Sequence, residues 1–542
     1  MSTIKMPRRH PSEKVAITNN DHHWHDCFLL TARFIRCITI QVVDSVPFEY
    51  SMASNHPAPH KSILFTNLYI SARTGSELHI LELSKAFSSA GWDVTCFALV
   101  IAHPFLEEFA NSGVKLVELG HESELSDSYT VLYAQHHLTA DFIWTNTDIS
   151  FDKIVVSSLG PQSEHEKLPL LSNNADLFVY VSEETRRANR PSSSSAPCII
   201  FPNCVSSDFF ETNMGTHRRT ESLPRRIAVI SNHVVPELRQ LANHLDCNSS
   251  ISFYGLEDRS VEVTPAFLQS FDLVITIGRT VVACFATHTP VYIYDVFGGD
   301  GYLNPGTLEQ SAQFNFSGRP GCKHRTSSEL WEDIASHYGE ACLNLEALYT
   351  YAKRDRSFET VFERLLFEIE SITPRAHSSR NFDSIIRVKQ HLLAESFALQ
   401  YGLTLGRAQL FYPGVDGALS EKNSVSFRFA YGAEISIHLD HPSNKFVRFD
   451  PDDCPVRCLT RPRLTPLNSF KSDERGDVFL TNDPMYAIPE TLTYLEFTCY
   501  KIDIQKEVAD SDTQTRRPSL SHRIHALPLR VARRLRRLLT AK

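Results

Sequence analysis

A predicted strand over 271–277 ends in residues that suit an anionic ligand. Its apolar, β-rich composition is typical of a buried parallel strand. Gly278, Arg279 and Thr280 follow at once, and the apolar residues 281–286 have the length and spacing of a helix. Amide groups at a helix start, with a guanidinium beside them, bind anions such as a diphosphate. We therefore predict that Gly278, Arg279 and Thr280 bind the donor of a reaction through its phosphates.

A second predicted strand, 291–294, ends in a similar way. Asp295 closes it, and a glycine turn that contains Gly298 and Gly299 follows. The strand, helix and strand form a βαβ unit, and open α/β sheets bind ligands at the carboxyl ends of such strands. The glycines have two interpretations, since they either line a ligand site or only make turns. Arg279 and Asp295, each beside a glycine turn, favour the ligand site.

Titratable side chains gather in the loop 159–169, which follows a predicted strand. Glu164, His165 and Glu166 lie in this loop. Carboxylate and imidazole groups at a strand end can serve as general acid or base. We predict that His165 and Glu166, together with Arg279, are catalytic, with the charged loop on the acceptor side. The alternative for each loop residue is a solvated surface position.

Three further residues are predicted on the donor side. Asn232 and His233 follow the predicted strand 227–231 and are expected to face the same cleft. Gly75 closes the turn after the first predicted strand, 62–70, where a helix starts.

Strands alternate with helices from Lys61 onward, which predicts a parallel, doubly wound sheet. Within this region we predict a helix over 128–139 and a strand over 142–146. From about residue 405 the pattern changes to short alternating runs separated by turn residues. These runs predict an antiparallel β-sandwich.

The composition excludes several functional classes. The 542 residues have a net charge of −9, with 42% hydrophobic and 22% charged residues, as in a soluble globular protein. The negative charge and the lack of a basic stripe in the folded part argue against nucleic-acid binding. The twelve cysteines contain no CxxC pair, and Cys454 and Cys458 lack partners at metal-site spacing. We expect reduced thiols in a cytosolic protein, with no metal.

Five stretches in this order resemble GT-B glycosyltransferases of the retaining, GT4-like group, closest to a bacterial surface-polysaccharide or lipopolysaccharide subgroup. They are SARTGSELHILELSKAFSSAGWDVTCFAL (71–99), ADLFVYVSEETRRA (175–188), IFPNCVSSDFF (200–210), RIAVISNHVVPELRQL (226–241) and 271–319. The resemblance covers roughly 61–340 and implies a GT-B fold of two Rossmann-like domains. One departure is clear, because Ile275 and Ala283 stand where the group usually has two glutamates. His288 stands where it usually has a glycine.

The resemblance and the patterns together predict a domain order. It is a disordered leader (1–58), an N-terminal Rossmann-like acceptor-side domain (59–205), a C-terminal Rossmann-like nucleotide-sugar domain (222–375), a linker helix (376–402), a β-sandwich accessory domain (403–508) and a linker with a basic tail (509–542). Met52 is an alternative start. The β-sandwich resembles accessory modules of polysaccharide glycosyltransferases and either binds carbohydrate or has a structural or oligomerising role.

The tail, 522–542, places Leu527, Val531, Leu535 and Leu538 on one helical face against many arginines. Such a basic amphipathic helix suits an anionic membrane surface, and a solvated terminal helix is the alternative. We therefore expect a cytoplasmic protein, with peripheral contact to the inner face of the cytoplasmic membrane as the further hypothesis.

The resemblance implies a glycosyltransferase of the hexosyltransferase type. It would move a sugar from a nucleotide-sugar donor to a surface-glycan or lipopolysaccharide-type acceptor, with retention and without a metal or other cofactor. Its partners would be the donor, a glycan or lipid-linked acceptor and no nucleic acid. The alternative is a non-catalytic glycan-binding or assembly protein on a degenerate GT-B scaffold, which the missing glutamates favour. A dinucleotide-dependent oxidoreductase fails, because no GxGxxG follows the first strand.

Overall fold

The computed structural model describes residues 61–504 with gaps. Residues 193, 246, 248 and 503 are outside the description, as are 212–222, 256–260, 378–381, 414–418, 440–447 and 490–491. The predicted leader and basic tail also lie outside the described residues, so both stay predictions. No helix among the described residues has the length and apolar character needed to cross a bilayer.

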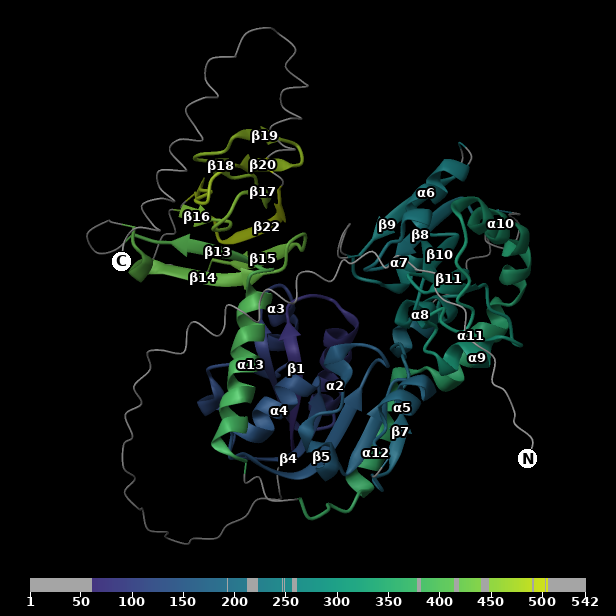
Figure 1. The fold of residues 1–542 in the computed structure, drawn as a ribbon. Coiled ribbons are helices and arrows are strands. Elements are labelled where there is room, and N and C mark those ends of the chain that lie inside the picture. Colours follow the sequence, from purple (N-terminus) through teal and green to yellow (C-terminus); the bar gives the residue numbers. More distant parts are fainter. Residues whose placement is uncertain are drawn as a thin grey trace, which may run out of the picture. The chain divides into compact units, whose positions relative to one another are not determined.

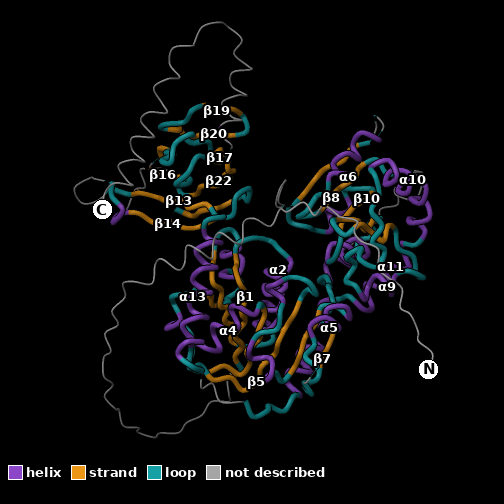
Figure 2. Tube along the Cα trace, in the orientation of Figure 1, coloured by secondary structure: helices purple, strands orange, loops and turns teal. Residues whose placement is uncertain are grey.

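The first domain is built on a parallel sheet of seven strands, in the order β3-β2-β1-β4-β5-β6-β7. Figure 1 shows this sheet between helices, and Figure 2 separates strands from helices by colour. The strands are β1 (Ser62–Ile70), β2 (Asp93–Ile101), β3 (Lys115–Glu118), β4 (Ser128–Gln135), β5 (Ser150–Ser158), β6 (Leu177–Tyr180) and β7 (Cys198–Ile200).

Apolar side chains alternate along the central strands, so each face of this sheet has its own core. Ile63 and Phe65 of β1 belong to one core, whereas Leu64 belongs to the other. The first core is covered by α2 (Gly75–Ser89), α3 (Phe105–Ala110) and α12 (Phe358–Ser371). The second is covered by α4 (His137–Asn146) and α13 (Ser384–Gly402). The remaining α-helix of this domain is α5 (Glu183–Asn189).

Two predictions within this domain are wrong. The predicted helix over 128–139 is strand β4 for most of its length, and the predicted strand over 142–146 is part of helix α4. Tyr129, Val131 and Tyr133 are buried in β4, where β-branched and aromatic side chains favour a strand. The chain turns sharply at His136, whose φ of 59° separates strand from helix.

The second domain has a smaller sheet in the order β12-β11-β10-β8-β9, parallel except for β12. Its strands are β8 (Arg226–Ile230), β9 (Ser250–Tyr254), β10 (Leu273–Thr276), β11 (Val291–Asp295) and β12 (Gly298–Gly301). One face is covered by α8 (Arg279–Ala286), α9 (Leu308–Gln313) and α11 (Leu345–Asp355). The other is covered by α6 (Pro236–Gln240) and α10 (Ser327–Leu343). Helix α7 (Pro265–Gln269) precedes β10.

The predicted glycine turn at 298–301 is the edge strand β12, antiparallel to β11. Close backbone packing explains its glycines. An ideal Cβ on Gly299 would lie 2.0 Å from the carbonyl oxygen of Ile293, and one on Gly298 would lie 2.7 Å from the carbonyl carbon of Lys323. Gly298 also has a φ of 75°. Sterics therefore require glycine at both positions, with or without a ligand.

Substitution of Gly299 by alanine is expected to destabilise the chain by more than roughly 2 kcal/mol, because the new methyl group has no room. Gly339→Ala is the matched control. A Cβ at Gly339 meets nothing within 4 Å inside helix α10, so this change should stabilise the chain by about 0.5–1 kcal/mol. Urea unfolding of the two variants beside the parent measures both effects. Equal stability of Gly299→Ala and the parent would contradict the packing account.

Two C-terminal helices pack on the first domain. Val361, Phe362, Leu365 and Ile369 of α12 join the first core. The predicted linker helix, α13, contributes Ala394 to the second core and does more than connect two domains.

The last domain is the predicted antiparallel β-sandwich, with sheets β14-β13-β16-β21-β18 and β15-β22-β17-β20-β19 around one shared core. Its strands are β13 (Gly406–Phe411), β14 (Ser424–Phe429), β15 (Ile435–His438), β16 (Arg448–Asp450), β17 (Val456–Arg461), β18 (Thr465–Pro466), β19 (Lys471–Asp473), β20 (Gly476–Phe479), β21 (Tyr486–Ala487) and β22 (Tyr494–Lys501). Short 3-10 helices in the chain include η1 (Glu122–Glu124), η2 (Glu164–Glu166), η3 (Leu170–Asn174), η4 (Ser207–Phe210), η6 (Leu241–His244) and η7 (Glu421–Asn423).

Candidate functional site

The order of the first sheet places a candidate site between β1 and β4. From β1 the chain builds outward through β2 and β3, and it then returns to add β4 on the other side of β1. The loops after β1 and β4 therefore leave the sheet in opposite directions, which opens a crevice at the carboxyl ends of these strands. The loop after β1 runs from Ser71 to Thr74, and β4 ends at Gln135 next to His136.

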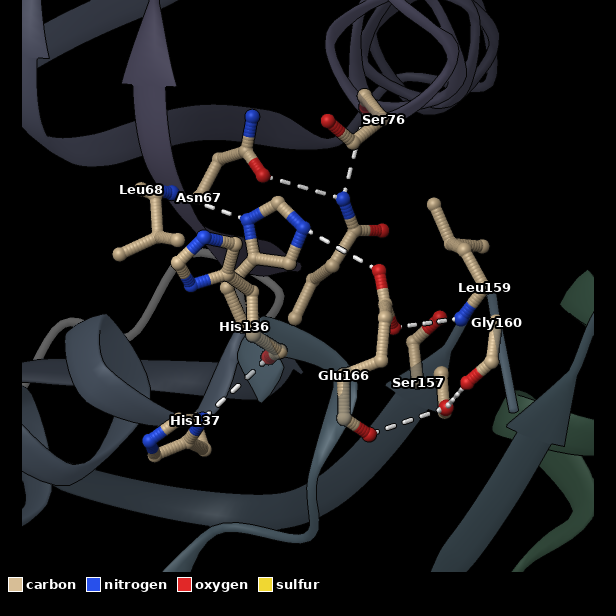
Figure 3. Close-up of polar contacts among 12 residues, drawn as sticks. Asn67, Leu68, Ser76, His136, His137, Ser157, Leu159, Gly160 and Glu166 are labelled. Atoms are coloured by element: carbon tan, nitrogen blue, oxygen red, sulfur yellow. Dashed lines mark hydrogen bonds and ion pairs between the residues drawn. The ribbon is translucent and has the colours of Figure 1, made fainter. Parts of the chain in front are cut away.

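His136 forms a buried pair with Glu166, one of the predicted catalytic residues. The backbone N–H of Leu68 donates to Nδ1 of His136 at 3.1 Å, so Nε2 is the protonated nitrogen. Nε2 lies 3.2 Å from Oε1 of Glu166, and both side chains are less than 10% exposed. The other carboxylate oxygen, Oε2, accepts from the backbone N–H of Leu159 at 2.6 Å. Figure 3 shows the imidazole between Leu68 and Glu166.

Both ring nitrogens of His136 are engaged, so this residue has no nitrogen left for a substrate. Its role is to fix the orientation of Glu166 through the hydrogen bond from Nε2. Each carboxylate oxygen of Glu166 has one protein donor and keeps a second lone pair. Glu166 is therefore the member of the pair that can accept a proton.

A buried amide extends this polar cluster. Nε2 of Gln135 donates to Oδ1 of Asn67 at 3.1 Å and reaches the carbonyl oxygen of Ser76 at 3.4 Å. Its Oε1 is buried and has no hydrogen-bond partner in the part of the chain that the structure describes. Buried polar atoms are normally paired. Gln135 thus offers an acceptor to a hydroxyl group of a ligand.

Glu77 holds the loop after β1 in place. Its side chain is fully buried in the first turn of α2, and Oε1 accepts from the backbone N–H groups of Ser71 and Ala72 at 2.6 and 2.9 Å. Oε2 accepts from the hydroxyl of Thr74 at 2.5 Å. The hydroxyl groups of Ser71 and Tyr401 lie 2.7 Å apart, which ties the same loop to α13. Burial raises the pKa of Glu77 to about 7, although Thr74 and the two amides oppose the shift.

Glu77 should make stability depend on pH near neutrality. Its folded pKa of about 7 lies above the usual 4.5, so its contribution is fully present below pH 4.5 and is lost as the pH rises through 7. Relative to Glu77→Gln, which cannot titrate, the parent should lose about 1–3 kcal/mol between pH 5 and pH 8. Urea unfolding of both proteins across this range measures the difference. A difference that does not vary with pH would contradict the buried carboxyl account.

His79 links this cluster to the predicted donor side. Burial lowers its pKa to about 3, and electrostatic interactions with Arg279 and His136 lower it further. Its Nε2 lies 3.3 Å from the hydroxyl of Tyr133. His79 is therefore within electrostatic range of Arg279 and of His136, the hydrogen-bond partner of Glu166. His165, the other predicted catalytic residue, is half-buried, and burial also lowers its pKa. The ring of His165 packs against the ring of Phe397, with 5.9 Å between the ring centroids.

The second sheet has its own change of strand order, between β8 and β10. Gly278, Arg279 and Thr280 follow β10 at this point, as predicted. Gly278 is the N-cap of α8 with a φ of 66°, a conformation that favours glycine. Arg279 makes a two-pronged ion pair with Glu82 of α2, in which Nη1 lies 2.5 Å from Oε2 and Nη2 contacts Oε1. The guanidinium predicted to bind phosphate thus already binds a carboxylate. Thr280 is partly exposed in the first turn of α8.

The structure also brings together the predicted residues after β8 and β11. The hydroxyl of Ser231 donates to Oδ2 of Asp295 at 2.9 Å and accepts from the backbone N–H of His233 at 2.9 Å. Asp295 is buried, which raises its pKa, whereas Asn232 and His233 are exposed.

The remaining predicted residues lie elsewhere. Gly298 and Gly299 belong to β12, and Gly75 is exposed at the start of α2 with open space around it. Asp452, Asp453 and Cys454 of the β-sandwich could together offer ligand atoms to a metal. Tyr431, however, already donates to Asp452 at 2.5 Å. The expectation that no metal is needed stays a prediction.

Sequence reasoning missed four residues of this region, namely Glu77, Glu82, His136 and Gln135. The predicted helix over 128–139 concealed His136 and Gln135, which end a strand instead. The polar pair that follows Ala134, just after the largely aromatic and β-branched run 129–133, was the signal that could have located them. Glu77 and Glu82 lie in the helix that starts after Gly75, where the sequence does not distinguish them from other polar positions. Nothing in the helical spacing marks Glu82 as the partner of a residue nearly two hundred positions away.

No protein-family model matches the sequence, and no curated protein matches it. Solved structures of glycosyltransferases are similar to the chain at low identity. A glycosyltransferase from Rickettsia africae is 11% identical with a TM-score of 0.39, over 58% of this chain and 98% of its own. WaaG, involved in lipopolysaccharide biosynthesis, is 9% identical with a TM-score of 0.39, over 57% and 100%. MurG of Acinetobacter baumannii is 10% identical with a TM-score of 0.35, over 58% and 100%.

Those values assign no activity or substrate to this chain. Its own topology settles the architecture, with a seven-stranded parallel sheet, a second Rossmann-like sheet and helix α12 returned to the first domain. The chain therefore has the GT-B fold, followed by an antiparallel β-sandwich.

Proposed function

We propose that the chain is a glycosyltransferase that moves a sugar from a nucleotide-sugar donor to a surface-glycan or lipopolysaccharide-type acceptor. One observation supports this proposal above the others. Both Rossmann-like sheets carry polar groups at the point where their strand order changes, Glu166 with His136 in the first and Arg279 with Gly278 in the second. Two such points in one chain suit a reaction between a nucleotide and a second substrate.

The donor side would bind the diphosphate at the start of α8. Departure of a nucleoside diphosphate leaves negative charge, which the guanidinium of Arg279 and the helix start can stabilise. Asp295 and the loop of Asn232 and His233 lie at the adjoining strand ends and would contact the nucleoside or the sugar. We propose no metal for this step, because a guanidinium and a helix start can supply the needed positive charge.

The acceptor side would be the crevice between β1 and β4. Glu166 would accept a hydrogen bond or a proton from the acceptor hydroxyl, held by His136 and by the backbone N–H of Leu159. Oε1 of Gln135, buried and unpaired among the described residues, would accept from a second hydroxyl. By resemblance to the GT4-like group, we propose retention of the anomeric configuration. From the basic amphipathic pattern of 522–542, we propose peripheral contact with the cytoplasmic face of a membrane.

A panel of nucleotide sugars tests the donor half of the proposal. Thermal-shift and calorimetric titrations of the full chain with UDP-, GDP-, ADP-, CMP- and dTDP-sugars should show stabilisation by one nucleotide class. Arg279→Ala should strongly reduce this stabilisation. If none of the five nucleotide classes stabilises the chain, the proposal is contradicted.

A second candidate is a glycan-binding or assembly protein without catalysis. Ile275 and Ala283, at the positions of the usual glutamates, are buried in β10 and α8 and are 0% and 3% exposed. A carboxylate at either place would lie in the apolar core, so this chain cannot hold a donor ribose in the usual way. This candidate would be favoured if calorimetry showed that the chain binds oligosaccharides but binds no nucleotide.

A further inference from the structure

Helix α13 is apolar on both faces. Ala394, Phe397 and Tyr401 face inward and pack on the first domain. The outward face carries five aliphatic side chains that are between 53% and 73% exposed, namely Ile385, Val388, Leu392, Leu399 and Leu403. With Ile386 and Leu393, this short segment holds seven of the nineteen exposed large hydrophobic side chains of the described residues. The concentration of exposed apolar surface on one element indicates an interaction surface.

The outward residues form one continuous stripe. Steps of three, four and seven residues keep side chains on the same side of a helix that turns 3.6 residues at a time. Ser396 occupies the one remaining place in the stripe, and the charged residues Lys389 and Glu395 flank it. The apolar face of a helix is normally buried against another element. The first domain covers one side of α13, so the other side is expected to be covered by a partner.

The chemistry of the stripe fits protein better than lipid. A helix that lies on a membrane has a strongly charged face, rich in lysine and arginine, opposite its apolar face. The face of α13 opposite the stripe is instead packed in a protein core. Lys389 is an exposed cation beside the stripe, and the exposed Glu395 lies on its other flank.

We propose that this stripe pairs with the same stripe of a second copy of the chain, in an antiparallel arrangement about a two-fold axis near Leu392. In a two-fold interface each patch must be complementary to itself. An axis at this position sets Leu392 against its counterpart and Ile385 beside Leu399 of the second copy. Ile385, Val388, Leu392 and Leu399 of each helix would then be covered together, whereas Leu403 lies at the end of α13 and outside the paired length.

Charge complementarity favours the antiparallel direction. His391 and Glu395 form an ion pair of 3.1 Å on one flank of the stripe. Antiparallel pairing about this axis places this flank of one copy beside the same flank of the other. His391 of each copy would then approach Glu395 of the other copy. Parallel pairing would bring opposite flanks together and would set Lys389 near His391 of the second copy, with no carboxylate at that height.

The contact would be of modest size. A pair of helices of 19 residues covers less than the roughly 1,600 Å² of a standard interface. We therefore expect a reversible dimer with a dissociation constant on the order of 1–100 μM.

Sedimentation velocity and light scattering of the full chain, up to about 200 μM, test the proposal. The parent and Leu343→Glu should dimerise with concentration, whereas Leu392→Glu should weaken dimerisation at least tenfold. Leu343 is the matched control, because it is 84% exposed on another helix, α10. Circular dichroism should show that both variants are folded.

A second variant tests the position of the axis. Leu392→Cys should form a disulfide-linked dimer on mild oxidation, above the background that the exposed Cys247 and Cys322 give in the parent. A parent that stays monomeric throughout, or equal effects of the two glutamate variants, would overturn the proposal. A monomeric parent that binds lipid vesicles, with that binding lost in Leu392→Glu, would also overturn it, in favour of a lipid surface. These outcomes do not depend on whether the chain transfers sugar.

Discussion

Replacement of Glu166 by glutamine is expected to lower sugar transfer by roughly 10²–10⁴-fold, the range that general acid–base groups contribute. The carboxylate has one donor on each oxygen, the N–H of Leu159 and the protonated Nε2 of His136. The single oxygen of a glutamine side chain can accept from only one of these two donors, and the glutamine NH₂ group then faces the other donor. The variant should therefore also lose about 1–3 kcal/mol of stability, the cost of an unpaired buried donor.

Glu164→Gln is the matched control for this change. Glu164 lies in the same short helix, is exposed and pairs with Lys167 rather than with the buried cluster. Transfer rates of both variants should be measured at saturating donor, beside donor affinity by calorimetry. Loss of rate in Glu166→Gln with unchanged donor affinity supports the acceptor-side assignment. Equal rates for the two variants would remove Glu166 from the mechanism.

The ion pair between Arg279 and Glu82 predicts large effects on nucleotide binding, which are opposite in sign for the two residues. Arg279→Ala should weaken nucleotide binding by roughly 10–100-fold, since hydrogen bonds to charged groups are worth about 1.5–3 kcal/mol. Glu82→Gln should instead tighten it several-fold. The carboxylate of Glu82 occupies both terminal nitrogens of Arg279, and a diphosphate must displace it.

Glu262→Gln is the control for Glu82→Gln. Glu262 pairs with Arg73 at 3.2 Å, so its replacement also removes a carboxylate that pairs with an arginine but leaves Arg279 untouched. Nucleotide affinity of all three variants can be measured by one calorimetric series at fixed ionic strength. Weaker binding in Glu82→Gln would show that Glu82 positions Arg279 for the ligand instead of competing with it.

Much of the fold could be predicted because its signals are local. The alternation of strands and helices, the apolar strand 273–276 and the change to short runs near residue 405 each depend on near neighbours in the chain. The prediction failed at 128–146, where a strand rich in tyrosine and a helix rich in aromatic residues have similar composition. Tertiary packing decided between them, since β4 lies beside β1 at the centre of the sheet.

The candidate site could be predicted only in part, for a related reason. Glu166 and Arg279 stood at strand ends, which a sequence can indicate. Their partners could not be predicted, because the contacts of His136 with Glu166 and of Glu82 with Arg279 span 30 and 197 positions (166 − 136 and 279 − 82). The glycines 298 and 299 show the opposite error. Their turn-like pattern suggested a ligand loop, whereas the backbone of Ile293 and Lys323 leaves no room for a side chain.

Direct observation of transfer tests the central claim most directly. The full chain would be incubated with the nucleotide sugar that stabilises it and with a bacterial surface-glycan or lipopolysaccharide precursor, and the acceptor would be followed by mass spectrometry. We predict that the acceptor gains one sugar, that nuclear magnetic resonance shows the donor's anomeric configuration in the product, and that Glu166→Gln slows the gain. A donor that binds but is neither transferred nor hydrolysed, in the parent and the variant alike, would contradict the account.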